Sequence, residues 1–252
     1  MYRVLTFNLL CYGSKHRKWT RRAPLVYKII REANPDSFGV QEAHWSWMKK
    51  LIKNLPEYAY VGVGREDGKK KGEFAAVFYK KDKFIASDSG NFWISETPEK
   101  PSKGWDSACT RVATYVKLTD KETGKSYVHF NTHLDHVGIQ AQINGAKMIQ
   151  EKAASFGGLP VVCTGDFNVL QDSDCYNTMV SANMKDARKL APETDDCLTY
   201  HGFRPDEIKA IIDFIFVDEK TVKPVKFKVI DKMINGEYYS DHYAAYADID
   251  LI

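Results

Sequence analysis

The sequence predicts an α/β protein in which two β-sheets pack against each other and helices cover their outer faces. The chain of 252 residues has no Gly/Ser/Pro-rich linker and no internal repeat, so we expect a single domain over residues 1–252. Helical periodicity alternates with long β-rich sections. Two runs, VVC at 161–163 and IIDFIFV at 211–217, are apolar on both faces, as in strands buried on both sides. We therefore expect mainly antiparallel or mixed sheets flanked by helices.

Three segments have the apolar spacing of amphipathic helices. They cover residues 20–33, 44–55 and 139–153, and a shorter helix is expected near 173–182. Asn34-Pro35 ends the first helix, and Gly157-Gly158 ends the third.

The remaining regular segments are predicted strands, because they are rich in β-branched and aromatic residues and are separated by turn signals such as Gly68 and Gly124. They cover 2–10, 36–40, 58–63, 74–79, 84–89, 108–118, 127–134, 161–163, 211–217, 225–230 and 243–251. The loop over 91–106 is rich in Trp, Pro and Ser. It is either a rim over a pocket or a packed surface loop.

Charge and cysteine content narrow the class of protein. A net charge of +3 is too small to indicate a nucleic-acid binder, and no apolar run approaches the ~18 residues of a membrane span. The five cysteines are odd in number and scattered, so we expect reduced thiols. Because a strand already begins near Arg3, we expect no signal peptide in this sequence. Reduced cysteines favour a cytoplasmic location, and we expect a monomer.

Two polar side chains follow the apolar run Val161 to Cys163. Asp166 and Asn168 stand at positions i and i+2, so in extended backbone both point to the same side. A carboxylate and an amide would then face the same space beyond a strand end, although a capped turn also uses these residue types.

Similar polar residues occur where other predicted strands end or begin. They are Asn8, Glu42, His133, Asp213, Asp241 and His242. Because ends of neighbouring strands can meet at one edge of a sheet, these residues are candidates for a common site.

Asp213 is the most informative of them, because a carboxylate inside IIDFIFV is costly to bury unless it is paired. We expect it to accept the Nδ1–H of a histidine, and His242 is the candidate. The alternative is a structural contact between Asp213 and the backbone.

Glu42 follows an apolar strand and suits a hard divalent cation such as Mg²⁺, which needs one or two carboxylates, with Asn8 or Asp241 as a further ligand. The alternative places Glu42 in the first turn of the next helix. Arg111 could bind a phosphate bidentately or lie on a solvated sheet face, and His133 could be a hydrogen-bonded core histidine.

The motifs FNLL, QE, NTHLDH, TGDFN, IDFIF and SDH occur in this order between residues 5 and 243. In this order they resemble the endonuclease/exonuclease/phosphatase superfamily, and SGNFWISETPEKPSKGWDSACTR resembles a bacterial branch that is distantly similar to deadenylase and nocturnin-like enzymes. The resemblance implies a four-layer α/β/β/α sandwich and Mg²⁺- or Mn²⁺-dependent hydrolysis of phosphoesters.

The resemblance also implies a role for each motif residue. Glu42 would be the main metal ligand, with Asn8 and Asp241 near the metal, and Asp166 would activate the attacking water. The phosphoryl oxygens would be held by Asn168, His133 and His242. His242 would be charged, and Asp213 would fix its orientation. The stretch after His136 departs from the family pattern, because either Gln140 or Gln142 stands where many related chains carry Arg. We therefore expect one contact to the phosphate or the metal to differ.

Three functions remain open from the sequence. The first is hydrolysis of a small-molecule or nucleotide phosphoester, the second is a nuclease acting on DNA or RNA, and the third is a non-catalytic module that binds a phosphorylated partner. The weak basic character disfavours a duplex as the partner, and Lys69-Lys70-Lys71 lies in a predicted hairpin loop beside acidic residues. Phe92, Trp93 and Trp105 could stack on a base or a sugar, with packing as the alternative.

Overall fold

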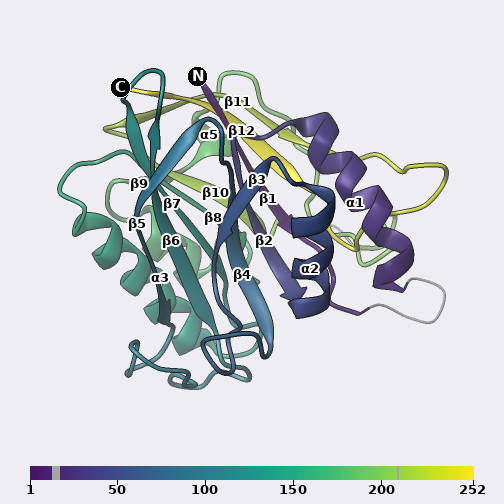
Figure 1. Ribbon diagram of the computed structural model, residues 1–252. Helices are drawn as coiled ribbons and strands as arrows, with labels where there is room; N and C mark the ends of the chain where they lie inside the picture. Colours follow the sequence, from purple (N-terminus) through teal and green to yellow (C-terminus); the bar gives the residue numbers. More distant parts are fainter. Residues whose placement is uncertain (13–17, 209) are drawn as a thin grey trace.

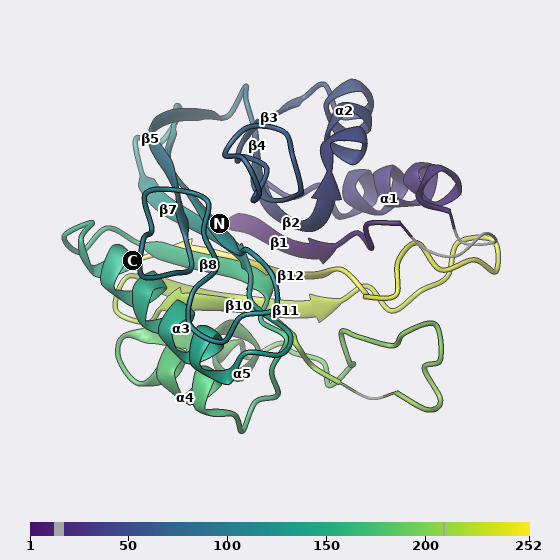
Figure 2. The ribbon, with the colours of Figure 1, turned by 90° about the horizontal axis from the view of Figure 1, so that it is seen from below.

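The computed structural model describes residues 1–12, 18–208 and 210–252 and contains two six-stranded sheets that pack face to face. Helices α1 (Trp19–Ala33) and α2 (Trp45–Asn54) cover one sheet, and α3 (Ile139–Ala154) covers the opposite side (Figure 1). The same separation is visible after a 90° turn in Figure 2. The expected α/β/β/α sandwich is confirmed.

The first sheet has the strand order β11-β12-β1-β2-β4-β3. Its strands are β1 (Tyr2–Asn8), β2 (Ser37–His44), β3 (Tyr58–Val61), β4 (Glu73–Lys80), β11 (Val222–Val229) and β12 (Ala245–Leu251). The central strands β1 and β2 are parallel and are connected through α1, whereas the other pairs are antiparallel.

The second sheet repeats this plan with the order β5-β6-β7-β8-β10-β9. Its strands are β5 (Phe84–Trp93), β6 (Val112–Asp120), β7 (Ser126–His133), β8 (Val161–Asp166), β9 (Met184–Asp186) and β10 (Asp213–Asp218). The central pair β7 and β8 is parallel and connected through α3, and α4 (Asp174–Val180) and α5 (Ala187–Leu190) follow β8 and β9. Each parallel pair ends at one edge of its sheet, where Asn8 lies opposite Gln41 and His133 lies opposite Asp166.

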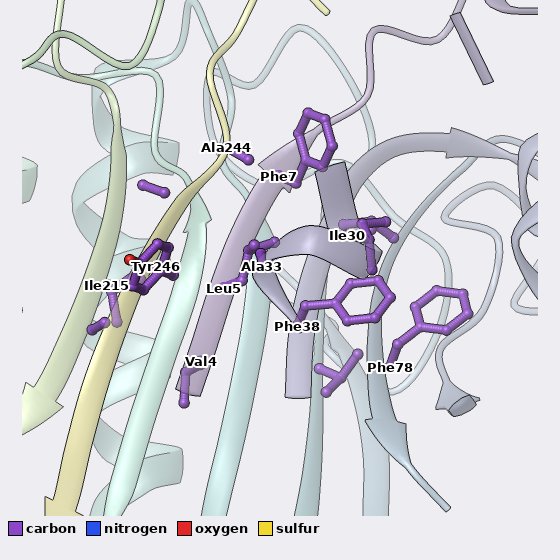
Figure 3. Close-up of a cluster of buried hydrophobic side chains, with 14 of the residues drawn as sticks. Val4, Leu5, Phe7, Ile30, Ala33, Phe38, Phe78, Ile215, Ala244 and Tyr246 are labelled. Carbon is purple, nitrogen blue, oxygen red and sulfur yellow. The ribbon is translucent and has the colours of Figure 1, made fainter. Parts of the chain in front are cut away.

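The apolar core fills the space between the sheets and beneath α1 and α2. Figure 3 shows part of it, in which Leu5, Phe38, Ile30 and Ile215 are fully buried. The ring of Phe38 stacks on Phe78 with a centroid distance of 4.9 Å. A separate cluster lies between the second sheet and the helices α3 and α4. Burial of these apolar faces is the main force that holds the layers together.

Polar side chains also connect the two sheets. His129 of β7 is fully buried, with Nδ1 2.7 Å from Ser37 Oγ of the opposite sheet and Nε2 2.9 Å from Thr164 Oγ1. Burial lowers the pKa of His129 to about 3, so the ring is neutral. Asn131 donates to two backbone carbonyls of the first sheet, and a Cβ at Gly39 would lie 2.2 Å from its Oδ1. Glycine at 39 is therefore needed for this close approach.

Several predicted strand boundaries are wrong. Strand β2 continues to His44 instead of ending at 40, and β11 begins at Val222 instead of 225. Strand β5 continues to Trp93, so the loop predicted from 91 begins later. A register shift between Ala86 and Asp88 interrupts the alternation of inward and outward side chains along β5. The pairing of β5 with β6 nevertheless continues beyond it, with Asn91 opposite Thr114. Strand β6 begins at Val112 instead of 108, because the backbone before it hydrogen-bonds a side chain, as described below.

Smaller differences affect the last third of the chain. The strands predicted from 211 and 243 begin at Asp213 and Ala245, and β9 and α5 were too short to be predicted. The five cysteines are free, as expected. Within the described ranges, no helix is long and apolar enough to cross a membrane.

Candidate active site

A cavity of about 380 Å³ opens at the edge where the parallel strands of both sheets end. Seven of the residues that the sequence indicates line it: Glu42, Arg111, His133, Asp166, Asn168, Asp241 and His242. Asn8 and Asp213 lie behind this lining and hydrogen-bond to it. The fold therefore brings all nine candidate residues to one place.

His242 stands between two buried carboxylates. Its Nδ1 lies 2.8 Å from Asp213 Oδ2, the expected pairing, and its Nε2 lies 3.7 Å from Asp166 Oδ2. Burial lowers the pKa of His242, but the two carboxylates outweigh this effect and raise it to about 10. The ring is therefore an imidazolium at neutral pH.

Asp166 has the properties of a base that works near neutral pH. Burial and the neighbouring Asp213 raise its pKa to about 7, while His242 and hydrogen bonds oppose the rise. Its carboxylate accepts from Asn8 Nδ2 at 2.8 Å and from the backbone N of Asn168 at 2.9 Å. These bonds fix the orientation of a group whose pKa suits proton transfer.

Glu42 lies within β2, at a register shift between Val40 and Ala43, and has a positive φ of 58°. It precedes α2, so the alternative reading as a helix-capping acid does not hold. Its Oε1 accepts from Asn8 Nδ2 at 3.1 Å, and its Oε2 accepts from the backbone N of Cys11 at 2.8 Å. The left-handed backbone is costly for a glutamate, which suggests a functional constraint.

Asp241 supplies a second carboxylate next to Glu42. Burial raises the pKa of Asp241, and the negative charge of Glu42 adds to the rise. Glu42 and Asp241 are half-buried carboxylates that line one cavity, and carboxylate oxygens are ligands that Mg²⁺ and Mn²⁺ prefer. The residues thus fit a hard divalent cation, with Asn8 in contact with Glu42.

Another set of ligand atoms lies within 4.8 Å of one another, on Asp166, Asp213 and His242. A metal at this position would require a neutral histidine with a free lone pair. Because both ring nitrogens of His242 face carboxylates and the ring is charged, an ion triad explains this set better than a metal does.

Arg111 is buried, with an exposed fraction of 4%, so the solvated sheet face considered above is wrong. Its Nε lies 3.5 Å from Asp135 Oδ2, and its Nη2 lies 3.1 Å from His136 Nδ1. Its Nη1 has no hydrogen-bond partner among the described residues. A buried guanidinium with a free donor at a cavity wall is suited to an anion.

Asp135 supports the wall of the cavity and was not among the residues that the sequence indicated. Its carboxylate accepts backbone N–H groups of Ala108, Cys109, Val137 and Gly138 at 2.9–3.0 Å. Burial alone would raise the pKa of Asp135, but these donors hold it well below its usual value. Asp135 thereby fixes both loops beside Arg111. Its place directly after a strand end, in NTHLDH, was the available signal.

His133 is buried and neutral, since burial and nearby cations such as Arg111 hold its pKa well below 6.5. Its Nε2 lies 3.5 Å from Asp166 Oδ2, and its Nδ1 lies 3.8 Å from Glu73 Oε2. The cavity wall also includes Arg65, Glu73 and Tyr200, which the sequence did not indicate. Glu73 is the first residue of β4, which runs antiparallel to β2, so Glu73 lies at the sheet edge where β2 ends. This position in the strand was the only indication of Glu73 that the sequence offered.

Arg22 is another residue that sequence reasoning missed. It is buried, and it donates to the backbone oxygens of Leu9, Leu10 and Tyr239. Burial lowers the pKa of Arg22 to about 10. The guanidinium thus joins the segment after Asn8 to the segment before Asp241.

The Trp-rich loop does not form a rim over this cavity. Phe92, Trp93 and Trp105 are absent from the described lining. Trp93 is buried instead, and its Nε1 donates to Arg65 O at 2.7 Å. Gln142, one of the two glutamines expected to replace an arginine of the family, is buried. Its Nε2 donates to Asp135 O at 2.7 Å, so this side chain supports the loop after β7 instead of lining the cavity.

Comparisons with known proteins agree with this geometry. The family model of the endonuclease/exonuclease/phosphatase family matches residues 5–242. An endonuclease/exonuclease/phosphatase structure from Bacteroides vulgatus is 39% identical and has a TM-score of 0.95, with 100% of this chain and 99% of that chain covered. A mannosyl-6-phosphatase from Bacteroides thetaiotaomicron is 32% identical, with a TM-score of 0.91 and coverage of 99% and 100%.

The catalytic domain of human nocturnin is 20% identical and has a TM-score of 0.77, with 100% of this chain and 94% of that chain covered, a likeness of fold alone. The family model covers nearly the whole chain, and the motif residues on which the resemblance was based line the cavity or hydrogen-bond to its lining. The chain therefore belongs to the endonuclease/exonuclease/phosphatase family.

Proposed function

We propose that the protein is a divalent-metal-dependent phosphoester hydrolase that acts on a small-molecule phosphoester. One observation carries this proposal: a buried carboxylate, Asp166, lies beside His242 and lines the same cavity as the carboxylates Glu42 and Asp241. Hydrolysis of a phosphoester requires this combination, because a water must lose a proton while negative charge on phosphorus is neutralised.

Glu42 and Asp241 would hold Mg²⁺ or Mn²⁺, and Asn8 orients Glu42 through the hydrogen bond described above. The bound cation would neutralise charge on the phosphoryl oxygens.

Asp166 accepts the proton of the attacking water, and the backbone N of Asn168 holds its carboxylate in place. Oxygens of the phosphoryl group face His242, Arg111, His133 and Asn168 on the cavity wall. His242 and Arg111 contribute positive charge there, and neutral His133 contributes a ring N–H. Asp213 orients His242 without contacting the substrate.

Two features favour a small ester over a polymer. The net charge is only +3, which is weak for an enzyme that tracks a nucleic-acid backbone. A relative at 32% identity is a mannosyl-6-phosphatase, which supports a phosphomonoester as the substrate. A nuclease is the second candidate. A pure binding module is disfavoured, because binding alone does not need a base such as Asp166.

The test is a phosphate-release assay with Mg²⁺ and Mn²⁺ on a panel of sugar phosphates, nucleotides, bis(p-nitrophenyl) phosphate, single-stranded RNA and an abasic duplex. We expect release from small esters that stops with EDTA and falls at least about 1,000-fold in Asp166→Asn. Asp172→Asn, on the exposed loop before α4, is the matched control and should be fully active. Cleavage of the polymers alone would favour the nuclease, and a folded but inactive protein would favour the binding module.

A further inference from the structure

Arg22 is a buried cation that is absent from the described lining of the candidate active site. It stands near the start of α1, which lies beside α2 over the first sheet (Figure 1). Its Nη1 donates to Leu9 O at 2.5 Å and to Tyr239 O at 3.1 Å, and its Nη2 donates to Leu10 O at 2.6 Å. The ring of Trp47 packs against it at 5.6 Å. Because the donors of a guanidinium form a rigid planar fork, these contacts hold Arg22 in one orientation.

Arg22 contacts two consecutive peptide groups, one on each side of Leu10. The N–H of the first group, Leu10 N, donates to Asn8 Oδ1 at 3.0 Å. The N–H of the second group, Cys11 N, donates to Glu42 Oε2 at 2.8 Å. The oxygens of the same two groups accept from the guanidinium. Arg22 is therefore connected to two of the residues suited to a metal, through one peptide group each.

The backbone conformation of Leu10 makes this arrangement possible. Its φ of 55° lies in the left-handed region, which is costly for a leucine. A residue in this conformation turns successive N–H groups toward one side, where they form a concavity that binds negatively charged oxygens. A cation on each peptide oxygen also polarises the group, so that its N–H becomes a stronger donor. The two N–H groups are thus both aimed and strengthened by Arg22.

Arg22 also reaches the segment that carries Asp241, through its bond to the backbone two residues earlier. Between them, Ser240 Oγ lies 2.7 Å from Asn8 O and 3.3 Å from Asp241 Oδ1. Burial lowers the pKa of Arg22, but the negative charges of Asp241 and Glu42 oppose this effect, so the guanidinium is charged at neutral pH. All three segments that supply the metal-suited oxygens therefore depend on this one side chain.

We propose that Arg22 is a positioning residue for the divalent metal, and that it sets the affinity of the metal site through the two peptide groups. The proposal rests on the metal-dependent hydrolysis proposed above. By charge alone, a buried cation near two carboxylates would weaken the binding of Mg²⁺. Positioning has the opposite effect, because ligands that are already oriented bind a cation more tightly. The sign of the change on removing Arg22 therefore distinguishes positioning from charge.

The first experiment is a calorimetric titration of Mg²⁺ and of Mn²⁺ into the full chain without substrate. Arg22→Met removes the charge and the donors but keeps an unbranched side chain. We expect the Kd of the metal to rise about tenfold or more, as when groups that orient metal ligands are lost. An unchanged or lower Kd in a folded variant would contradict the proposal.

Arg188→Met is the matched control. Arg188 is also buried, with an exposed fraction of 5%, and also donates to two backbone oxygens, those of Asp195 and Cys197. It is absent from the described lining of the cavity. Its loss should lower Tm, as the loss of any such buried donor does, but should leave the Kd of the metal unchanged.

Arg22→Lys keeps the proposal testable if Arg22→Met does not fold. The ammonium retains the charge but lacks the planar fork that bonds adjacent carbonyl oxygens. We expect the Kd of the metal to rise about threefold or more in this variant. A folded Arg22→Lys protein with the wild-type Kd would rule out the role of the fork.

Amide NMR tests the route through the peptide groups in the metal-free protein. In Arg22→Met or Arg22→Lys, the amide protons of Leu10 and Cys11 should move upfield, because both hydrogen bonds to the metal-suited oxygens weaken. The same signals should stay in place in Arg188→Met. Unmoved signals in the Arg22 variants would show that the side chain does not act through these peptide groups.

These measurements need no turnover, so they separate this proposal from the hydrolysis proposal. If no ester is hydrolysed but the affinity for Mg²⁺ depends on Arg22, hydrolysis is wrong and the role of Arg22 stands. If esters are hydrolysed with Mg²⁺ but the Kd is the same in wild-type and Arg22→Met, the role of Arg22 is wrong and hydrolysis stands. A wild-type protein that binds neither Mg²⁺ nor Mn²⁺ would overturn both.

Discussion

Asp166 and Asp213 are direct cross-strand neighbours, paired between the antiparallel strands β8 and β10. Both are almost completely buried, and two carboxylates in this position repel each other. The imidazolium of His242 lies against both of them and offsets the repulsion. The charge states of these three residues therefore depend on one another, which makes their pH behaviour testable.

Asp213→Asn should shift the alkaline limb of the pH–rate profile. The carboxylate of Asp213 raises the pKa of His242 to about 10, so its removal lets His242 lose its proton at lower pH. Activity that needs the imidazolium should then decline at lower pH, and kcat should fall about 100-fold or more. The pH dependence of kcat/KM measures this shift. Asp218→Asn, at the other end of β10, is the control, and an unmoved limb in Asp213→Asn would contradict the role of the triad.

The acidic limb of the same pH–rate profile should report the loss of the proton from Asp166. A base must be deprotonated, and burial with Asp213 raises the pKa of Asp166 to about 7. We expect activity to rise as pH increases toward about 7, with the limb moving to lower pH at saturating metal because a cation favours the carboxylate. A pH profile at low and saturating Mg²⁺ tests this expectation, and a limb insensitive to metal would argue against it.

Glu42→Gln should weaken metal dependence without unfolding the protein. A neutral amide is a poorer ligand than a carboxylate for a hard cation, so the Mg²⁺ concentration at half-maximal rate should rise about tenfold or more. Thermal unfolding with and without Mg²⁺ gives a second measurement, because a cation that binds the folded state raises Tm. Glu151→Gln, on the exposed face of α3, should leave both values unchanged.

His129 should make the fold sensitive to acid. Its pKa is about 3 in the folded state, because of burial, and about 6.5 when the chain is unfolded. Between these values the unfolded chain binds one more proton, so the free energy of unfolding falls as pH decreases, on the order of 1 kcal/mol per unit. Urea unfolding at several pH values measures the slope. His129→Gln should reduce that slope, and an identical slope in the variant would contradict the assignment.

The errors of the sequence-based prediction have physical causes. The Trp-rich loop was a candidate rim, yet Trp93 turns inward because β5 continues past a register shift that hides its periodicity. The sequence could not decide whether Arg111 is buried or exposed, because its burial depends on contact with Asp135, 24 residues later in the chain. Glu73 and Arg65 gave no motif signal, since their ion pair forms only when the loop between β3 and β4 folds back.

The sequence by itself determined the layers and the chemical types at the strand ends. Helical and strand periodicities are local, and polar residues such as Asp166 and Asp213 stand out against apolar runs. Tertiary structure decided which of these groups interact and with what charge. The pKa of His242 depends on two carboxylates, Asp166 and Asp213, that strand pairing brings together. Burial and distance set electrostatic energies, and both arise from contacts between residues far apart in the chain.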